Sequence, residues 1–156
     1  MPMTFATETF LPTAVTEPMQ ITLPAGLIGL SELREFDLTA IDASWPFLNL
    51  RSQGDLEIEF LAAEAKNLVA DYAIHLPDED ALALALAAPE DALILNIVTV
   101  HSMRPQFVTV NLAGPIIVNR HTLVGRQIVL PAGEHHSTVH PLIDERPKLS
   151  VVPSLS

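Results

Sequence analysis

The stretches ALILNIVTV (92–100), QFVTVNLAGPIIVNR (106–120) and GRQIVL (125–130) decide the fold of this chain. Residues Leu93–Val100 form a nearly unbroken apolar run rich in branched side chains, which is typical of a strand buried on both faces. From Phe107 to Leu112 every second residue is Val or Leu, which indicates a strand with one wetter face.

Gly114-Pro115 interrupts this pattern, because proline cannot donate a ladder hydrogen bond and glycine tolerates a sharp change of direction. Ile116–Val118 then resumes the strand pattern and Asn119 ends it. We therefore predict a compact antiparallel unit. In it, Asn111 and Asn119 satisfy backbone groups at strand ends, and Pro115 protects a sheet edge from unwanted pairing.

The rest of the chain contains further short strand patterns within a length that suits one domain. The 156 residues are 49% hydrophobic, which is enough for a sizeable core. Many short strands leave many edges to cover, so we predict a mainly antiparallel, all-β, barrel-like single domain with one short helix. The additional strand candidates are Ile21–Leu23, Phe36–Leu38, Phe47–Leu50 and Leu56–Phe60.

The helix is expected within PDEDALALALAAP (77–89). Asp78, Glu79 and Asp80 would lie at its start, where negative charge suits the positive end of the helix dipole. Leu82, Leu84 and Leu86 also alternate, so a strand is the competing interpretation. The alanine content and the flanking prolines favour the helix.

The ends of the sequence lack the regular patterns of the middle. We expect residues 1–18 to be a flexible arm, residues 19–143 to be the folded domain, and residues 144–156 to be a C-terminal tail. The first 20 residues lack a basic region followed by an apolar run, so they do not resemble a signal peptide. No apolar run is long enough to span a membrane.

The charge of the chain restricts its partners. Its net charge is −11, from 19 acidic and 8 basic side chains, which repels nucleic acid phosphates and favours basic proteins. We therefore expect no direct nucleic acid binding and no membrane partner. The absence of cysteine excludes disulfides, thiolate nucleophiles and cysteine-ligated metals.

Several segments, in order along the chain, resemble one known family. LPAGLIGL (23–30) followed by LREF (33–36), PFLNLRS (46–52), DY (71–72) and PED (89–91) precede a TVNL-x-x-PI-x-x-N motif at 109–119 and G-x-Q-x-x-L at 125–130. This ordered series is similar to the flagellar assembly factor FliW family. The resemblance covers about residues 19–143, most of the chain.

The resemblance implies a function that composition alone does not. Proteins of this family are cytoplasmic regulators that bind the RNA-binding translational repressor CsrA and flagellin. They antagonise RNA binding by CsrA allosterically and so relieve repression of flagellin translation. The implied protein is not an enzyme, needs no cofactor, and is a monomer when free. The alternative is a small β-barrel protein that binds a metal or small molecule, including as an enzyme.

Acidic side chains are the first candidates for contacts with a basic partner, since charge accelerates association. Apolar anchors must complete such an interface. Candidate acidic residues are Asp78, Glu79, Asp80, Glu90 and Asp91, with Glu57 and Glu59 on a predicted strand. Candidate apolar anchors are Leu27, Ile28, Met103 and Phe107.

Catalytic and metal sites have little support in the sequence. His135, His136 and His140 lie close together, and imidazole is a common zinc ligand. Adjacent histidines in a strand point apart, and Gly133 and Pro141 disfavour a helix that would bring two of them together. No nucleophile elbow or phosphate-binding glycine motif occurs. We predict no metal site and no catalytic residues.

Overall fold

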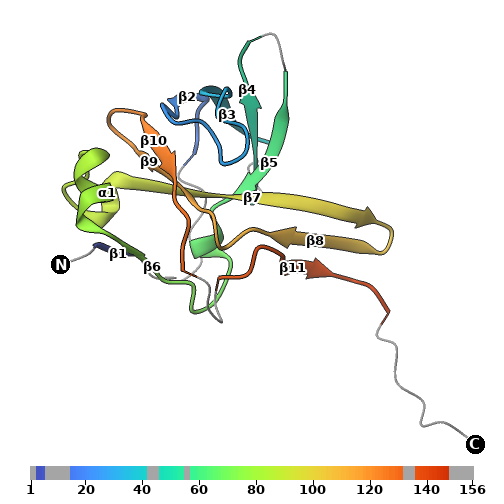
Figure 1. The fold of residues 1–156 in the computed structure, drawn as a ribbon. Helices are drawn as coiled ribbons and strands as arrows, with labels where there is room; N and C mark the ends of the chain where they lie inside the picture. The colour runs from blue at the N-terminus through green and yellow to red at the C-terminus, as the bar shows by residue number, and fades with distance from the viewer. Residues whose placement is uncertain (1–2, 6–14, 42–45, 55–56, 132–135, 148–156) are drawn as a thin grey trace, which may run out of the picture.

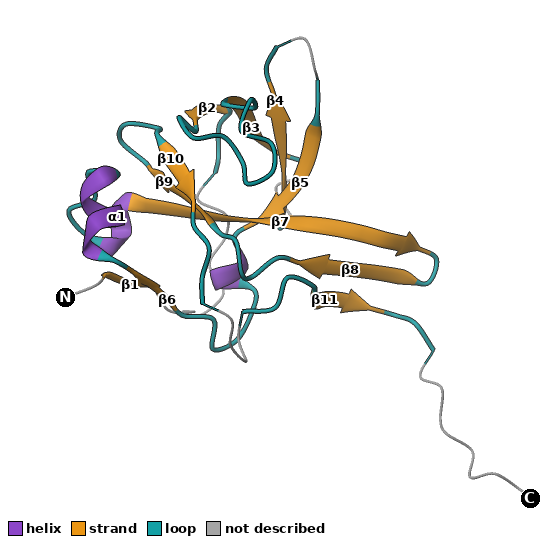
Figure 2. Ribbon diagram, viewed as in Figure 1, coloured by secondary structure: helices purple, strands orange, loops and turns teal. Residues whose placement is uncertain are grey.

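A twelve-residue strand, β7 (Ala92–Met103), crosses the molecule and connects its parts (Figure 1). The computed structural model describes residues 3–5, 15–41, 46–54, 57–131 and 136–147. The other strands are β1 (Met3–Phe5), β2 (Met19–Thr22), β3 (Glu35–Ala40), β4 (Phe47–Ser52), β5 (Glu59–Ala63), β6 (Ile74–Leu76), β8 (Gln106–Val110), β9 (Ile116–Asn119), β10 (Gly125–Gln127) and β11 (His140–Asp144). The helices are η1 (Ala65–Asn67), α1 (Asp78–Ala83) and η2 (Pro89–Asp91), of which only α1 is an α-helix (Figure 2).

The main sheet follows the strand order β10-β9-β7-β5-β4-β3-β2, and each neighbouring pair is antiparallel. Its two ends meet at one parallel bridge between Thr22 and Val124. There the Thr22 N–H donates to the Leu123 carbonyl at 2.9 Å. The sheet thus curls round without a continuous ladder closing it. The predicted mainly antiparallel β fold with one short helix is confirmed.

β7 changes its partner halfway along. Its first part, Ala92–Leu95, pairs with β9, and its second part, from Val98, pairs with β8. Residues 111–115 lie between β8 and β9 and leave the ladder there, which is the interruption predicted from Gly114-Pro115. β9 pairs with β7 on one side and β10 on the other. Pro115 therefore does not protect a free edge, contrary to expectation.

The far ends of β7, β8 and β11 form a three-stranded extension that projects from the rest of the molecule (Figure 1). Residues Thr99, Val100, His101 and Met103 are exposed there. The prediction of a strand buried on both faces therefore holds only for the first part of β7. These four side chains of β7 are therefore accessible on the extension.

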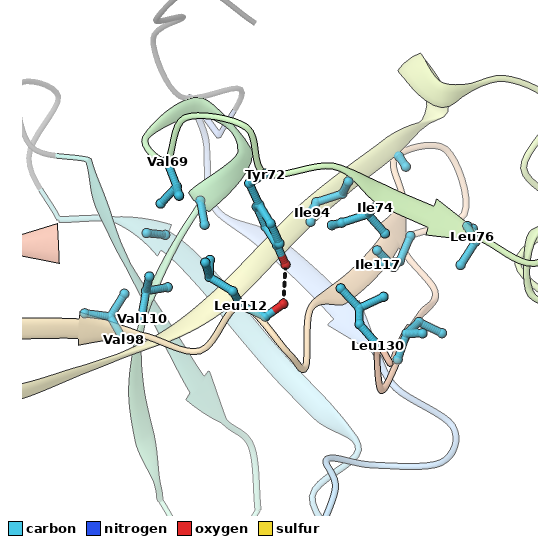
Figure 3. Close-up of a cluster of buried hydrophobic side chains, with 14 of the residues drawn as sticks. Val69, Tyr72, Ile74, Leu76, Ile94, Val98, Val110, Leu112, Ile117 and Leu130 are labelled. Atoms are coloured by element: carbon cyan, nitrogen blue, oxygen red, sulfur yellow. Dashed lines mark hydrogen bonds between the residues drawn. The ribbon is translucent and has the colours of Figure 1, made fainter. Parts of the chain in front are cut away.

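Two hydrophobic clusters lie on opposite faces of the sheet. β7 contributes Ala92, Ile94 and Val98 to one of them, and Leu93 and Leu95 to the other. This is the alternation expected of a strand, with both faces covered. The first cluster is shown in Figure 3, where side chains from β6, β7, β8 and β9 surround a buried tyrosine.

The buried tyrosine, Tyr72, anchors a polar network inside the first cluster. Its hydroxyl donates to the Leu112 carbonyl at 2.6 Å (Figure 3). The hydroxyl also accepts from Asn96 Nδ2 at 3.0 Å. Asn96 Nδ2 also donates to the Asn111 carbonyl at 2.9 Å. Within the described part of the chain, Asn96 Oδ1 is buried without a hydrogen-bond partner. Burial raises the pKa of Tyr72 to about 12, because the charged phenolate would be desolvated.

The ends of the chain differ from the simple arm and tail expected. Met3–Phe5 forms β1, which pairs with β6, and Val15 is buried in the second cluster. Asp144, where the tail was expected to begin, is the last residue of β11 and pairs with Phe107. Within these two predicted segments, residues 1–2, 6–14 and 148–156 lie outside the described residues. No helix in the described ranges has the length and apolar character needed to cross a membrane.

Candidate protein-binding surfaces

The residues proposed as contacts from the sequence separate into two surfaces at opposite ends of β7. The helix surface comprises α1 and η2, with the acidic candidates of residues 78–80 and 90–91. The hairpin surface comprises Met103 and Phe107 at the tip of the extension. Since a strand rises about 3.3 Å per residue, these surfaces are separated by about 36 Å along β7. One compact partner domain does not readily contact both.

α1 begins directly after Pro77 and has carboxylates at its first three positions. This favours a helix start there, because the unpaired N–H groups of the first turn carry partial positive charge. Asp78 and Glu79 are exposed. Asp80 is partly covered, and its Oδ1 lies 3.0 Å from Arg126 Nη1 of β10. Asp80 therefore joins the helix to the sheet, and Asp78 and Glu79 lie at its exposed start.

Asn119 fixes the end of α1 in place. This buried side chain donates from Nδ2 to the carbonyls of Leu84 at 2.8 Å and Ala85 at 3.2 Å. Its Oδ1 accepts from the backbone N–H groups of His121 at 2.8 Å and Thr122 at 3.2 Å. All four bonds satisfy backbone groups, so Asn119 supports the helix surface from beneath and does not itself face a partner.

η2 places two more acidic residues beside α1. Glu90 is exposed, whereas Asp91 is half-buried. Asp91 Oδ1 lies 3.0 Å from His121 Nε2, and Asp91 Oδ2 accepts from the Ala88 N–H at 3.0 Å. The bond from His121 contributes most to holding the pKa of Asp91 below its usual value. Asp91 is thus engaged within the protein, which leaves Glu90 as the available charge of η2.

Two of the predicted apolar anchors, Leu27 and Ile28, lie in the loop after β2, and one of them is not exposed. Leu27 was expected to be exposed, but only 5% of it is accessible, because it pairs with Leu30 and packs in the second cluster. Its neighbour Ile28 is 59% exposed, and the Ile28 N–H donates to Gln127 Oε1 of β10 at 2.8 Å. Of the two, only Ile28 is placed to contact a partner.

The hairpin surface combines one exposed anchor with one covered anchor. Met103 is 68% exposed at the tip. Phe107 is half-buried, because the His101 ring stacks on it at 4.7 Å and the Arg146 guanidinium lies 3.5 Å from its ring centroid. Asp144 accepts two hydrogen bonds from that guanidinium, each 2.8 Å long. Met103 is therefore accessible at the tip, whereas Arg146 covers one face of the Phe107 ring.

The remaining candidates lie elsewhere. Glu57 and Glu59 are exposed next to β4, and Glu57 forms an ion pair of 2.9 Å with Arg51. A groove of about 370 Å³, which the sequence did not indicate, lies over β2, β3 and β4. A crevice of about 180 Å³ between α1 and β10 was likewise not predicted. Both depend on which elements pack side by side, and a sequence has no local pattern for that.

Comparison with known proteins identifies the family. The sequence profile described as "FliW protein" matches residues 4–142.

The chain belongs to the FliW family.

It is 36% identical over 132 residues to the flagellar assembly factor FliW of Natranaerobius thermophilus, covering 85% of this chain and 87% of that protein. The Geobacter sulfurreducens FliW is also 36% identical, over 92% of this chain and 88% of its own. A crystal structure of the flagellar assembly factor FliW superposes with a TM-score of 0.71 at 26% identity, covering 84% of this chain and 88% of that chain.

The motif residues that suggested the FliW family make contacts within the fold. Asn111 Oδ1 accepts from the N–H groups of Ala113 at 3.0 Å and Gly114 at 3.1 Å, which stabilises the turn between β8 and β9. Pro115 is buried, and its carbonyl accepts from the Ile128 N–H at 2.9 Å. With Asn119 beneath α1, these residues shape the FliW fold and do not contribute exposed contact groups.

The histidines considered as metal ligands are not brought together in the described residues. His136 Nδ1 hydrogen bonds to the Pro131 carbonyl at 2.8 Å, and its ring meets Tyr72 edge-on. His140 begins β11 and pairs with Val110. His135 lies outside the described residues. Within the described ranges, no group of three His, Asp or Glu side chains could hold a metal ion.

Proposed function

We propose that this chain is a non-catalytic, protein-binding regulator of flagellar assembly that binds a CsrA-type translational repressor and flagellin. Binding to the repressor weakens its hold on flagellin messenger RNA and relieves repression. The observation that carries the proposal is the family match over residues 4–142. The proposed protein acts in the cytoplasm, is a monomer when free, and uses no cofactor.

The charge distribution supports a basic protein partner. The chain carries −11 net charge, and Asp78, Glu79 and Glu90 are exposed on the helix surface. These carboxylates would repel RNA phosphates and attract Lys and Arg side chains of an RNA-binding protein. The proposal therefore has the chain contact the repressor and not the RNA.

Antagonism of this kind requires coupling between two sites on the repressor. If the chain lowers the affinity of the repressor for RNA, RNA must lower the affinity of the repressor for the chain by the same factor. This reciprocity distinguishes a coupled complex from simple removal of the repressor by aggregation. Flagellin completes the proposed circuit, because it binds the same chain and displaces the repressor.

Size-exclusion chromatography with light scattering tests the first step. The chain and the CsrA homologue of the same organism are mixed at micromolar concentration in low salt, and the mixture is titrated against a labelled flagellin leader RNA. We expect a discrete heteromeric peak, and release of RNA that saturates at a fixed stoichiometry. An effect that continues at substoichiometric amounts would indicate turnover and contradict a non-catalytic role.

Two further outcomes bear on the proposal. Flagellin monomer added to the complex should release the repressor and form its own complex with the chain. An intact repressor that forms no complex at low salt would remove the antagonist role. Binding of flagellin alone would then leave a role in flagellar assembly that does not involve translation.

A further inference from the structure

β6 is a strand whose edge is covered by the start of the chain. It pairs with β1 alone among the described strands, and the two form a two-stranded sheet separate from the main sheet (Figure 2). The pairing is antiparallel, with Met3 opposite Leu76 and Thr4 opposite His75. An isolated pair of strands is at best marginally stable, so β6 must be held by other contacts.

β6 and β1 are held very unequally. Ile74 and Leu76 of β6 are completely buried in the first cluster. β6 also leads directly into α1, and Asn119 fixes the end of that helix. By contrast, Met3 of β1 is only half-buried and Thr4 is exposed. β6 would therefore keep its place if β1 left, and its edge would then be open.

β1 shows which chemistry this edge accepts. Met3 packs against the first cluster from its position opposite Leu76. Thr4 Oγ1 lies 3.1 Å from His75 Nδ1, which is a hydrogen bond between two exposed side chains. An extended segment that adds to a sheet edge gains affinity from main-chain hydrogen bonds and specificity from alternate side chains. The edge therefore suits an extended segment with an apolar side chain opposite Leu76 and a hydroxyl opposite His75.

The two ends of the edge differ in charge. Beyond Leu76, β6 leads into α1, whose first residues Asp78 and Glu79 are exposed carboxylates. A segment in the register of β1 runs antiparallel to β6, so its N-terminal end approaches these carboxylates. Its C-terminal end runs toward Ala73 and Tyr72, which precede Ile74 and carry no charge. Lys or Arg at the N-terminal end of a docking segment is thus favoured over the same residues at its C-terminal end.

We propose that the edge of β6 is a docking site for an extended segment of a partner protein, with basic residues directly before an apolar residue and a hydroxyl residue. β1 is a displaceable occupant of the same edge. The partner segment and β1 exclude each other, because both need the same backbone groups of β6. The inference goes beyond the proposed function, since the site would serve any protein that carries such a segment.

The attachment of β1 to the same chain sets the strength of this competition. Tethering by a short linker gives a group an effective concentration on the order of millimolar at its site. The apparent affinity for a free segment is reduced in proportion to the fraction of molecules whose edge is open. Loss of the β1 pairing should therefore raise the affinity of the chain for the segment.

Two variants of β1 test whether this strand can leave. Met3→Asp places a charge against the first cluster, and Met103→Asp, at the exposed hairpin tip, is its matched control. Thr4→Pro combined with Phe5→Pro removes two successive N–H groups, so the one that faces β6 is lost. Hydrogen exchange followed by mass spectrometry reports the β6 amides, and urea unfolding reports the rest of the fold. We expect the β6 amides to exchange at least about tenfold faster in both β1 variants, and the β7 amides to be unchanged.

Labelled peptides with blocked ends serve as docking probes, and fluorescence anisotropy measures their binding. Lys-Lys-Met-Thr-Phe-Ala carries the β1 sequence after two basic residues, and Met-Thr-Phe-Ala-Lys-Lys has the same charge at the other end. We expect the first peptide to bind both β1 variants at least about tenfold more tightly than it binds the wild-type and Met103→Asp chains. The first peptide should also bind the β1 variants about two- to fivefold more tightly than the second, as for an exposed ion pair.

Several results would overturn the inference. β6 amides that stay protected in both variants would mean that β1 does not cover the edge. Loss of the whole fold in both variants would make β1 an integral strand and not a displaceable one. Open β6 amides without peptide binding would mean that the edge accepts no partner segment. Equal binding of the first peptide by wild-type and variant chains would show that β1 does not compete.

Equal binding of the two peptides would contradict the antiparallel register that brings the basic end to α1, and the inference would fall on that result as well. None of these measurements uses the CsrA homologue. Failure of this inference therefore leaves the proposed function standing, and failure of the proposed function leaves the docking site to be judged by the peptides alone.

Discussion

Asn119 at the end of β9 holds the Leu84 carbonyl at 2.8 Å, so a buried amide connects the main sheet to the helix surface. Asn119→Ala would remove this bond and three others to backbone groups, leaving buried donors and acceptors without partners. We expect the free energy of unfolding to fall by about 2–4 kcal/mol, measured by urea denaturation. Asn67→Ala, at a half-buried amide in η1, should cost less than about 1 kcal/mol. Equal costs would contradict the role given to Asn119.

Tyr72 is the single tyrosine of the chain, so tyrosinate absorbance reports it alone. Its pKa is raised from 10.0 to about 12. Because the folded state keeps the phenol neutral, its contribution to stability is complete below pH 10.0 and is lost as the pH rises toward 12. In buffer, where the protein is folded, we expect little change in tyrosinate absorbance near pH 10. In concentrated urea, where the chain is unfolded, we expect Tyr72 to titrate near pH 10. Titration near pH 10 in the folded protein would show that the hydroxyl is not buried.

His121 and Asp91 offer a test by carboxyl chemical shifts. The hydrogen bond from His121 lowers the pKa of Asp91 in the folded protein. The stability that this bond provides is therefore present above the pKa that Asp91 has in the unfolded chain, and it is lost as the pH falls through the lower pKa of the folded state. His121→Ala should move the pKa of Asp91 upward in a carbon-13 NMR titration. His75→Ala, at a histidine that hydrogen bonds to Thr4, should leave it unchanged.

Gly26 and Gly29 form a matched pair in the loop that carries Ile28. Both have positive φ, +71° and +82°, so alanine is strained at either. A Cβ at Gly26 would lie 2.5 Å from the Ser31 carbonyl oxygen, whereas a Cβ at Gly29 would meet nothing within 4 Å. We expect Gly29→Ala to cost about 1 kcal/mol and Gly26→Ala clearly more, in thermal or urea unfolding. The reverse order would refute this loop geometry.

The association of the chain with the repressor should depend on salt. Opposite charges accelerate encounter, and salt screens them, so the association rate should fall several-fold between about 0.05 and 0.5 M NaCl while the dissociation rate changes less. Surface plasmon resonance separates the two rates. Glu90→Lys should flatten the salt dependence of association. A rate that is independent of salt would exclude a basic partner surface.

The strands that were predicted are those whose own sequence alternates or stays apolar. β7, β8 and β9 follow from the runs around Asn111 and Gly114-Pro115, and the carboxylates of 78–80 mark the start of α1. The helix is shorter than its pattern, ending at Ala83, because Ala85 adopts a positive φ of 55° and the chain turns there. Leu86, one of the alternating leucines behind the competing strand interpretation, is buried in the first cluster after the chain turns.

Other features depend on residues far apart in the chain. β11 contains proline and has no alternation, and it exists because β8 offers it an edge. Tyr72 and Asn96 meet only when β7 lies beneath the η1 turn, and the crevice exists only because α1 packs beside β10. From the sequence, Leu27 was expected to be an exposed loop residue. Its pairing with Leu30 depends on the glycine turn between them, which the local pattern did not reveal.

The division of β7 between two hydrophobic clusters has a consequence for how the protein unfolds. Alternate side chains of one strand complete both clusters, so neither can persist once β7 leaves the sheet. We therefore expect the two clusters to unfold in a single cooperative transition, without an intermediate in which one cluster is formed and the other is open to solvent. The strand that separates the two clusters is also what makes them one folding unit.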